Sequence, residues 1–289
     1  MSLIDLSMSQ LTSPVPVALT IAGSDSGGGA GIQADLRTFA FHRVHGTSAL
    51  TCVTAQNTIG VDRVDALPPE AVVAQIQSVV QDIGVQAVKT GMLLNAPIME
   101  GVAQEIQRDR LPHLVIDPVM VSRSGVQLID DTAIVALKSL LIPHAQLLTP
   151  NRYEAQLLSG LDINTVEEMT QAAKRILELG CGAVLIKGGG FSGSLRGVDL
   201  WWDGEQTELL VTECVHTPHT HGTGCTLSAA IVANLALGLS LKDSVKAAKQ
   251  YVTQALHHAL AIGKGQGPVG HFFPLLLKPF SPLPSRRGE

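Results

Sequence analysis

Short runs of apolar, often β-branched residues alternate along this chain with longer stretches of helical period. Strands that are apolar along their whole length are buried on both faces, and intervening helices supply the crossovers that parallel pairing needs. The sequence therefore predicts an α/β fold, a three-layer α/β/α sandwich around a mostly parallel sheet. The predicted strands are Val17–Ala22, Ser48–Val53, Ala87–Thr90, Leu114–Asp117, Ala145–Thr149 and Ala183–Lys187. The predicted helices span 31–43, 69–82, 96–109, 131–141, 165–180, 223–238 and 241–262.

One pair of strands is expected to be antiparallel. Asp203-Gly204 separates Gly197–Trp202 from Glu208–Val215, a pattern typical of a hairpin, here at the edge of the sheet. No internal repeat or low-complexity linker interrupts the chain, and 289 residues can bury one large core. We therefore expect a single domain with a tail at each end: a domain over 15–274, a flexible N-terminal tail over 1–14 and a C-terminal tail over 275–289.

Composition excludes several classes of protein. An apolar fraction of 45% with 16% charged residues is ordinary for a globular enzyme, and a net charge of −5 argues against nucleic-acid binding. The four cysteines have no CxxC spacing, and no Lys or Arg precedes Arg37, so we expect a cytoplasmic protein without a secretory signal. Gly222–Leu241 carries no charge, but its Gly-Thr-Gly start and polar residues favour a buried helix over a membrane span.

Polar and glycine-rich segments follow the predicted strands. In an open parallel sheet, ligands bind outside the carboxyl ends of the strands, so these segments are expected to meet at one rim. A helix start joins them there. The segments are Gly23–Gly31, Asp117–Met120, Thr149–Glu154, Lys187–Gly190 and Thr220–Cys225.

The strongest single motif is His221-Gly-Thr-Gly-Cys225, directly before a long apolar helix. Backbone amides at Gly222, Thr223 and Gly224, together with the helix dipole, favour an anion site for a phosphoryl group. The simpler alternative is an N-cap in which Thr223 satisfies the first amides. Cys225 lies at the same helix start, where its pKa is expected to be lowered toward neutrality, so that it can accept a proton from an alcohol. An inert, buried cysteine is the alternative.

Two other glycine-rich segments are weaker signals. Ser24–Gly31 matches neither a Walker A loop nor a dinucleotide fingerprint, and it is equally consistent with a substrate-pocket floor and with a tight turn. Gly188–Gly193 does match G-x-G-x-x-G, which makes a dehydrogenase a formal alternative. However, a predicted strand follows where the fingerprint requires a helix, so a nicotinamide site is disfavoured.

Charged side chains directly after buried strands indicate a site for a nucleotide and a metal ion. Asp117 and Glu154 suit a hydrated Mg²⁺, and Lys187 suits a nucleotide phosphate. Singly, such residues are more often helix caps or surface charges. His216, His219 and His221 also suggest a metal site, but their spacing is loose and no fourth ligand is near.

Taken together, these segments resemble the hydroxymethylpyrimidine/phosphomethylpyrimidine kinases. The resemblance covers about residues 17 to 273, and the joint order of the motifs makes it specific. The matching segments are Leu19–Asp35, Val53–Thr58, Lys89–Met92, Asp117–Met120, Thr149–Asn151 with Glu154, Lys187–Gly189, His221–Ser228 and Gly263–Val269.

The resemblance implies a ribokinase-like, usually dimeric enzyme that uses ATP and Mg²⁺. Its substrate would be 4-amino-5-hydroxymethyl-2-methylpyrimidine, phosphorylated first at the hydroxymethyl group and then at the monophosphate. The implied catalytic residues are Cys225, as the base, with Gly222, Thr223 and Gly224. The implied substrate residues are Gln56, which binds the aminopyrimidine, with Gly23, Asp25, Ala30 and Met92. The implied nucleotide residues are Lys187, Asn151, Asp117 and Thr220, and the metal residues are Glu154 and Asp117.

Two positions depart from the family pattern. The loop reads Asp25-Ser-Gly-Gly-Gly29 where some members have Asp-Pro-Ser-Gly-Gly, and Arg123 stands where lysine is common, which keeps the charge but changes the reach. Two rival functions follow from the same scaffold. One is a pyridoxal-type vitamin kinase, and the other is a ligand-sensing protein that binds a pyrimidine without turnover. Cys225 and the intact anion motif argue against a ligand-sensing protein without turnover.

Overall fold

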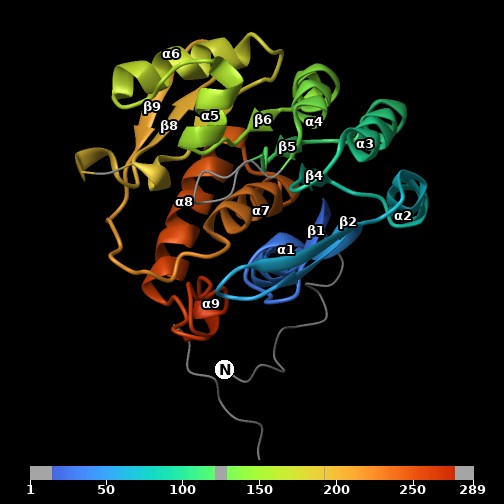
Figure 1. The fold of residues 1–289 in the computed structure, drawn as a ribbon, viewed down its shortest axis with the longest axis horizontal. Helices are drawn as coiled ribbons and strands as arrows, with labels where there is room; N and C mark the ends of the chain where they lie inside the picture. The colour runs from blue at the N-terminus through green and yellow to red at the C-terminus, as the bar shows by residue number, and fades with distance from the viewer. Residues whose placement is uncertain (1–14, 121–128, 192, 277–289) are drawn as a thin grey trace, which may run out of the picture.

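A mostly parallel sheet forms the centre of the molecule in a computed structural model that describes residues 15–120, 129–191 and 193–276 (Figure 1). Within these residues the sheet has nine strands in the order β3-β2-β1-β4-β5-β6-β7-β8-β9. Strands β2, β1, β4, β5, β6 and β7 run parallel, whereas β3, β8 and β9 add antiparallel edges. The strands are β1 (Val17–Asp25), β2 (His45–Gln56), β3 (Val61–Ala66), β4 (Ala87–Thr90), β5 (Leu114–Ile116), β6 (Leu147–Leu148), β7 (Val184–Ile186), β8 (Asp199–Trp202) and β9 (Thr207–Leu210).

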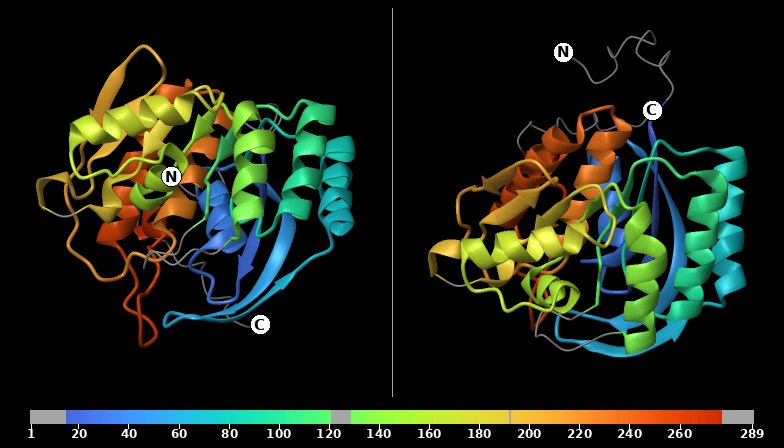
Figure 2. Two further views of the ribbon diagram at one scale, coloured as in Figure 1. Left: turned by 45° about the horizontal axis from the view of Figure 1, so that its top comes forward. Right: turned by 90° about the horizontal axis from the view of Figure 1, so that it is seen from above.

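Helices cover both faces of this sheet, which confirms the predicted three-layer sandwich (Figure 2). One face packs against α2 (Pro69–Asp82), α3 (Ala96–Asp109), α4 (Asp131–Ala136), α5 (Arg152–Ser159) and α6 (Val166–Leu177). The other packs against α1 (Gly31–Phe41), α7 (Thr223–Ala236) and α8 (Leu241–His257), and a short helix, α9 (Phe273–Leu276), follows. Alternate residues of β1 show the two cores: Leu19 and Ile21 face one, and Ala18 faces the other.

Most predicted elements are confirmed, and α2 and α3 have the predicted bounds. Three strands or α-helices were missed: β3, α5 and the four-residue helix α9. Strand β3 is exposed along its whole length, so no apolar alternation marks it. Helix α5 has only eight residues and begins inside the polar segment Thr149–Glu154, after which no helix was predicted. The predicted strand Glu208–Val215 is wrong at its end, because β9 stops at Leu210.

Helix α7 confirms the prediction of a buried helix for the uncharged segment. Every residue from Thr226 to Ala236 is buried. Among the described residues, no helix combines the length and apolar character needed to cross a membrane. The predicted tail over 1–14, residues 277–289 of the predicted C-terminal tail, and Arg123 lie outside the described residues.

Candidate active site

The loop after β1 is organised by one buried carboxylate. Asp25 is 3% exposed, and its Oδ1 accepts a hydrogen bond of 2.8 Å from the Gly27 amide. Its Oδ2 accepts bonds from the amides of Gly29 (3.0 Å) and Ala30 (2.8 Å). The pKa of Asp25 is lowered: burial opposes ionisation, but His221 and the loop amides outweigh it. Asp25 therefore shapes the Gly27–Ala30 loop, which we call the substrate loop.

Strand β2 brings Gln56 against the same loop. The Ser26 hydroxyl donates to the Gln56 carbonyl (2.6 Å) and accepts from the Gln56 amide N–H (2.8 Å). The Gln56 side-chain oxygen accepts from the Thr54 hydroxyl at 3.2 Å. Gln56 is thus brought from a separate segment to the loop that contains Ala30 and that Asp25 organises.

Gly23 and Met92 are also brought together. A Cβ on Gly23 would lie 2.6 Å from Cys52 Sγ and 3.0 Å from the methyl carbon Met92 Cε, so only glycine leaves these two side chains in place. The Met92 carbonyl is held by the Thr51 hydroxyl at 2.7 Å. Cys52 is a buried neighbour of Gly23 that was not predicted at this site. Its place near the carboxyl end of a predicted strand was the available signal.

The start of α7 lies directly against the substrate loop. Gly222 is the N-cap of α7, with φ 80°, and a Cβ there would overlap the Gly29 carbonyl oxygen. The alternative in which Thr223 caps the helix is wrong, because α7 has no side-chain cap and the Thr223 hydroxyl donates to the Thr220 carbonyl. The first-turn amides of α7 are therefore left without a side-chain acceptor. We call Gly222–Cys225 the phosphate loop.

The expected low pKa of Cys225 is wrong. Burial raises the pKa of this thiol to about 11, and the carboxylates of Asp35 and Asp117 add to the increase. Lys89 and the Gly31 amide, which donates a hydrogen bond to Cys225, oppose the increase without cancelling it. Cys225 in the resting protein is therefore a neutral thiol at pH 7.

A buried charge cluster lies beside the phosphate loop. Lys187 Nζ is 2.6 Å from Asp117 Oδ1 and 4.0 Å from Glu154 Oε2. Burial opposes both charges of the closer pair, but each partner stabilises the other: the pKa of Asp117 is lowered by Lys187, and the pKa of Lys187 is raised by Asp117. A Cβ on Gly224 would lie 3.4 Å from Lys187 Nζ. The structure thus brings the predicted residues Lys187, Asp117 and Glu154 together.

Asn151 and Glu154 have a structural task as well. They form a capping box at the start of α5: the Asn151 side chain accepts from the Glu154 amide (3.0 Å), and Glu154 Oε2 accepts from the Asn151 amide (2.7 Å). Burial raises the pKa of Glu154 to about 7, against the attraction of Lys187. The helix-cap interpretation of both residues is therefore confirmed, whereas their binding roles remain predictions.

Within the described residues, no group of three or more His, Cys, Asp or Glu side chains could hold a metal ion alone. The histidines have other partners: His219 Nδ1 accepts from the Gly267 amide (3.0 Å), and His221 binds Asp25. A metal held by Asp117 and Glu154 would need further oxygen ligands, such as nucleotide phosphates and water. The Thr220 hydroxyl is buried without a hydrogen-bond partner among the described residues, and its contact with a nucleotide remains a prediction.

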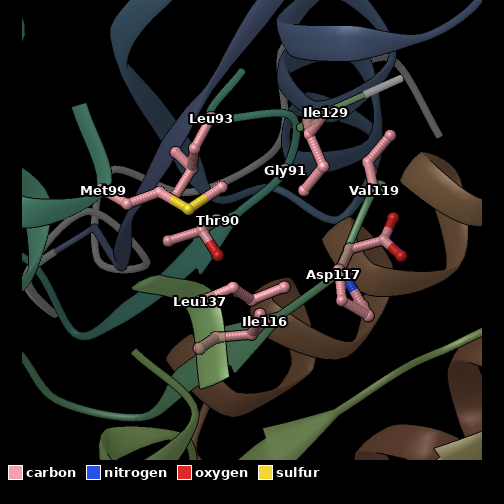
Figure 3. Close-up of a pocket in the computed structure, with 10 residues that line it drawn as sticks. Thr90, Gly91, Leu93, Met99, Ile116, Asp117, Val119, Ile129 and Leu137 are labelled. Carbon is pink, nitrogen blue, oxygen red and sulfur yellow. The ribbon is translucent and has the colours of Figure 1, made fainter. Parts of the chain in front are cut away.

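A small cavity of about 10 Å³ lies behind Asp117 (Figure 3). Thr90, at the end of β4, borders it together with Asp117 and apolar side chains such as Leu93 and Met99. The Thr90 hydroxyl is buried and has no hydrogen-bond partner among the described residues. The space suits about one water molecule, far less than a substrate needs.

The dinucleotide-like glycines do not form a fingerprint. Gly188–Gly190 and Gly193–Leu195 are single 3₁₀ turns, and β8 follows them rather than a helix. A Cβ on Gly188 would overlap the Val198 carbonyl oxygen, and the Gly188 amide donates to Asp199 Oδ1 at 2.7 Å. Gly188 therefore serves close packing at the edge of the sheet.

Known proteins resemble this chain in sequence and in fold over most of its length. The sequence model of the family described as phosphomethylpyrimidine kinase matches residues 25–270. A hydroxymethylpyrimidine/phosphomethylpyrimidine kinase of Synechococcus elongatus is 64% identical over 261 residues, which cover 90% of this chain and 99% of the relative. A pyridoxine kinase of Bacillus subtilis is 43% identical over 257 residues, covering 88% and 95%. The solved ADP complex of Bacillus subtilis pyridoxal kinase has a TM-score of 0.84 at 41% identity, covering 89% of this chain and 97% of that one.

Proposed function

The chain belongs to the phosphomethylpyrimidine kinase family, and from this premise we propose that it phosphorylates 4-amino-5-hydroxymethyl-2-methylpyrimidine and then its monophosphate, with ATP as donor. The product would be the pyrimidine diphosphate used in thiamine biosynthesis. The 64% identity to a kinase of that name, over almost its full length, is the observation that carries the proposal. The contact between the substrate loop and the phosphate loop at Gly29 and Gly222 supports it.

The two loops suit an in-line transfer that depends on positioning and charge. Phosphoryl transfer requires little covalent help from a protein, and most of the catalysis comes from alignment and from stabilising charge. The uncapped amides of the phosphate loop would bind the transferring phosphoryl group, and Lys187 would neutralise charge beside it. Gln56, Gly23 and Met92 would hold the pyrimidine ring near the same point.

Magnesium is a proposed companion of ATP at Asp117 and Glu154. These two carboxylates suit an ion that keeps several waters and shares phosphate oxygens. A Cβ on Gly224 would lie 3.7 Å from Asp117 Oδ2, so the phosphate loop runs directly beside this carboxylate. The ion would neutralise phosphate charge when bound. Asn151 and Thr220 would contact the nucleotide from either side of this cluster.

A pyridoxine-type kinase is the second candidate, because a relative of that name is 43% identical over most of its length. One assay separates the two. ADP release coupled to an indicator, together with chromatography of the phosphorylated product, should show turnover of the pyrimidine alcohol and of its monophosphate. We expect the pyrimidine to exceed pyridoxine in kcat/KM by at least about tenfold, since a site that hydrogen-bonds one ring rejects others. A higher kcat/KM for pyridoxine than for the pyrimidine would instead indicate a pyridoxine kinase.

Glu154→Gln should raise the Mg²⁺ concentration needed for half-maximal rate and lower turnover. Glutamine keeps an oxygen for the Asn151 amide, so the cap persists while the charge is lost.

The free energy of unfolding of the parent protein should also fall as pH rises from about 5 to 8. Its Glu154 has a folded-state pKa of about 7, above the unfolded value, so the folded state binds the extra proton. Glu154→Gln should flatten this dependence, measured by urea unfolding. An unchanged Mg²⁺ requirement would remove Glu154 from the metal site.

Assembly and location complete the proposal. We propose a homodimer, supported by exposed apolar side chains on the β2–β3 hairpin: Val53, Ile59, Val61 and Val64 are 43%, 71%, 50% and 42% exposed. All four cysteines, Cys52, Cys181, Cys214 and Cys225, are unpaired thiols. Free thiols suit a reducing compartment and support the cytoplasm as the location.

A further inference from the structure

One side-chain bond links two residues that flank the loops: Asp25, just before the substrate loop, and His221, just before the phosphate loop. His221 Nε2 lies 2.8 Å from Asp25 Oδ2, across a separation of 196 residues in the chain. Asp25 is the buried carboxylate that already binds the amides of Gly27, Gly29 and Ala30. The carboxylate can only accept, so the imidazole N–H donates.

The imidazole also packs on the loop that Asp25 shapes. A Cβ on Gly29 would overlap His221 Cδ2, so the ring lies directly against the Gly29 backbone. His221 thus acts on the substrate loop in two ways: indirectly through Asp25, which binds the loop amides, and directly through contact with Gly29. Gln56 Nε2 is 3.5 Å from the same ring nitrogen, which already donates to Asp25. The N–H groups of the Gln56 side chain therefore remain available for a ligand, while its oxygen accepts from the Thr54 hydroxyl.

The main chain of His221 is fixed from the opposite side. Its amide donates to the Gly267 carbonyl (3.2 Å), and its carbonyl accepts from the Val269 amide (3.2 Å), so that it forms a parallel bridge with Pro268. The next residue is Gly222, the N-cap of α7. Because the backbone is fixed on both sides, the imidazole cannot move far unless the start of α7 moves with it.

We propose that His221 is a positioning residue which, through Asp25, holds the substrate loop in register with the phosphate loop. Its bond sets the separation between the alcohol oxygen and the transferring phosphoryl group, and it does not exchange a proton with either substrate. Misplacement of about 1 Å can cost about 10²-fold in rate, so losing the bond should slow transfer more than binding. The expected loss of phosphoryl-transfer rate rests on the proposed function, whereas the structural link between the two loops does not.

The test compares His221→Ala, His221→Gln, Asp25→Asn and the double variant His221→Ala/Asp25→Asn. His221→Ala should lower kcat of both phosphorylations by about 10–100-fold, with KM values within about threefold of the parent. ADP should form in excess over phosphorylated pyrimidine, because misaligned phosphoryl groups meet water. His221→Gln should recover most of the rate, since its side-chain amide can still donate to Asp25. The double variant should be no slower than the slower single variant.

Two controls make the outcome decisive. His216→Ala changes an exposed histidine of the same segment and should leave kcat unchanged. Gln56→Ala should raise KM for the pyrimidine, the opposite pattern. Hydrogen exchange of the Gly27, Gly29 and Ala30 amides in ligand-free His221→Ala should be faster than in the parent, which tests the link even if the pyrimidine is not the substrate. Additive losses in the double variant, a loss confined to KM, or unchanged exchange would overturn the proposal.

Discussion

Cys225→Ala should slow phosphorylation of the alcohol by about 10²–10⁴-fold, the range for a positioned base. Phosphorylation of the monophosphate should fall much less. An alcohol keeps its proton far above neutral pH, whereas a phosphate monoester has a second pKa of about 6 and presents an ionised oxygen at pH 7. The measurement is single-turnover formation of each product at saturating ATP, which separates the chemical step from product release.

Cys225→Ser is the matched control because it keeps the volume of the side chain and changes its acidity. If Cys225 is the base, the serine variant should resemble alanine in the first reaction and the parent in the second. Equal losses in both reactions for both variants would mean that Cys225 shapes the phosphate loop. Unchanged rates in both would make it a packing residue.

The raised pKa of Cys225 adds a pH signature to this prediction. A thiol with a pKa of about 11 is neutral below that pH, and its thiolate fraction grows about tenfold per pH unit. The first phosphorylation should therefore accelerate from pH 7 toward pH 10, and Cys225→Ala should abolish the rise. The second phosphorylation should be flat over the same range, since its nucleophile is already ionised. A flat profile for the parent in both reactions would contradict the role of Cys225 as a base.

Local sequence patterns predicted the sheet and the convergence of the polar segments at one edge of it. Buried strands followed by polar residues are visible in the sequence, and the rule for parallel sheets then places Asp117, Glu154 and Lys187 at one rim. The structure confirms that these three are neighbours. Strand β3 could not be found in the same way, because its exposed residues carry no apolar period.

Long-range contacts explain what the sequence could not reveal about the site. The helix start before Cys225 is visible in the sequence and suggested a low pKa. The opposing carboxylate of Asp35 comes from α1, and burial of the thiol depends on the packing of α1 against α7. Asp35 itself is paired with Lys89 at 2.8 Å, and neither side chain is exposed. The bond from His221 to Asp25 likewise leaves no local trace.

Lys187→Met should lower turnover in both phosphorylations by about 10²–10³-fold, the typical cost of losing one group that stabilises transition-state charge. It should also destabilise the fold by about 3–5 kcal/mol, because Asp117 would remain buried without its partner. Methionine keeps most of the length and the apolar stem of the side chain but removes the charge and the hydrogen bond to Asp117. Lys246→Met is the matched control: its ion pair with Glu208 lies at the surface and should be worth at most about 1 kcal/mol.

The double variant Lys187→Met/Asp117→Asn separates stability from catalysis at this cluster. Removing both charges eliminates the uncompensated carboxylate, so urea unfolding should show most of the lost stability restored. Turnover should stay at or below that of Lys187→Met, because neither the phosphate contact nor the carboxylate returns. If turnover recovered together with stability, Lys187 would serve only to neutralise Asp117, and its contact with the nucleotide would be excluded. If neither recovered, Glu154, 4.0 Å from Lys187 Nζ, would be the carboxylate that depends on the lysine.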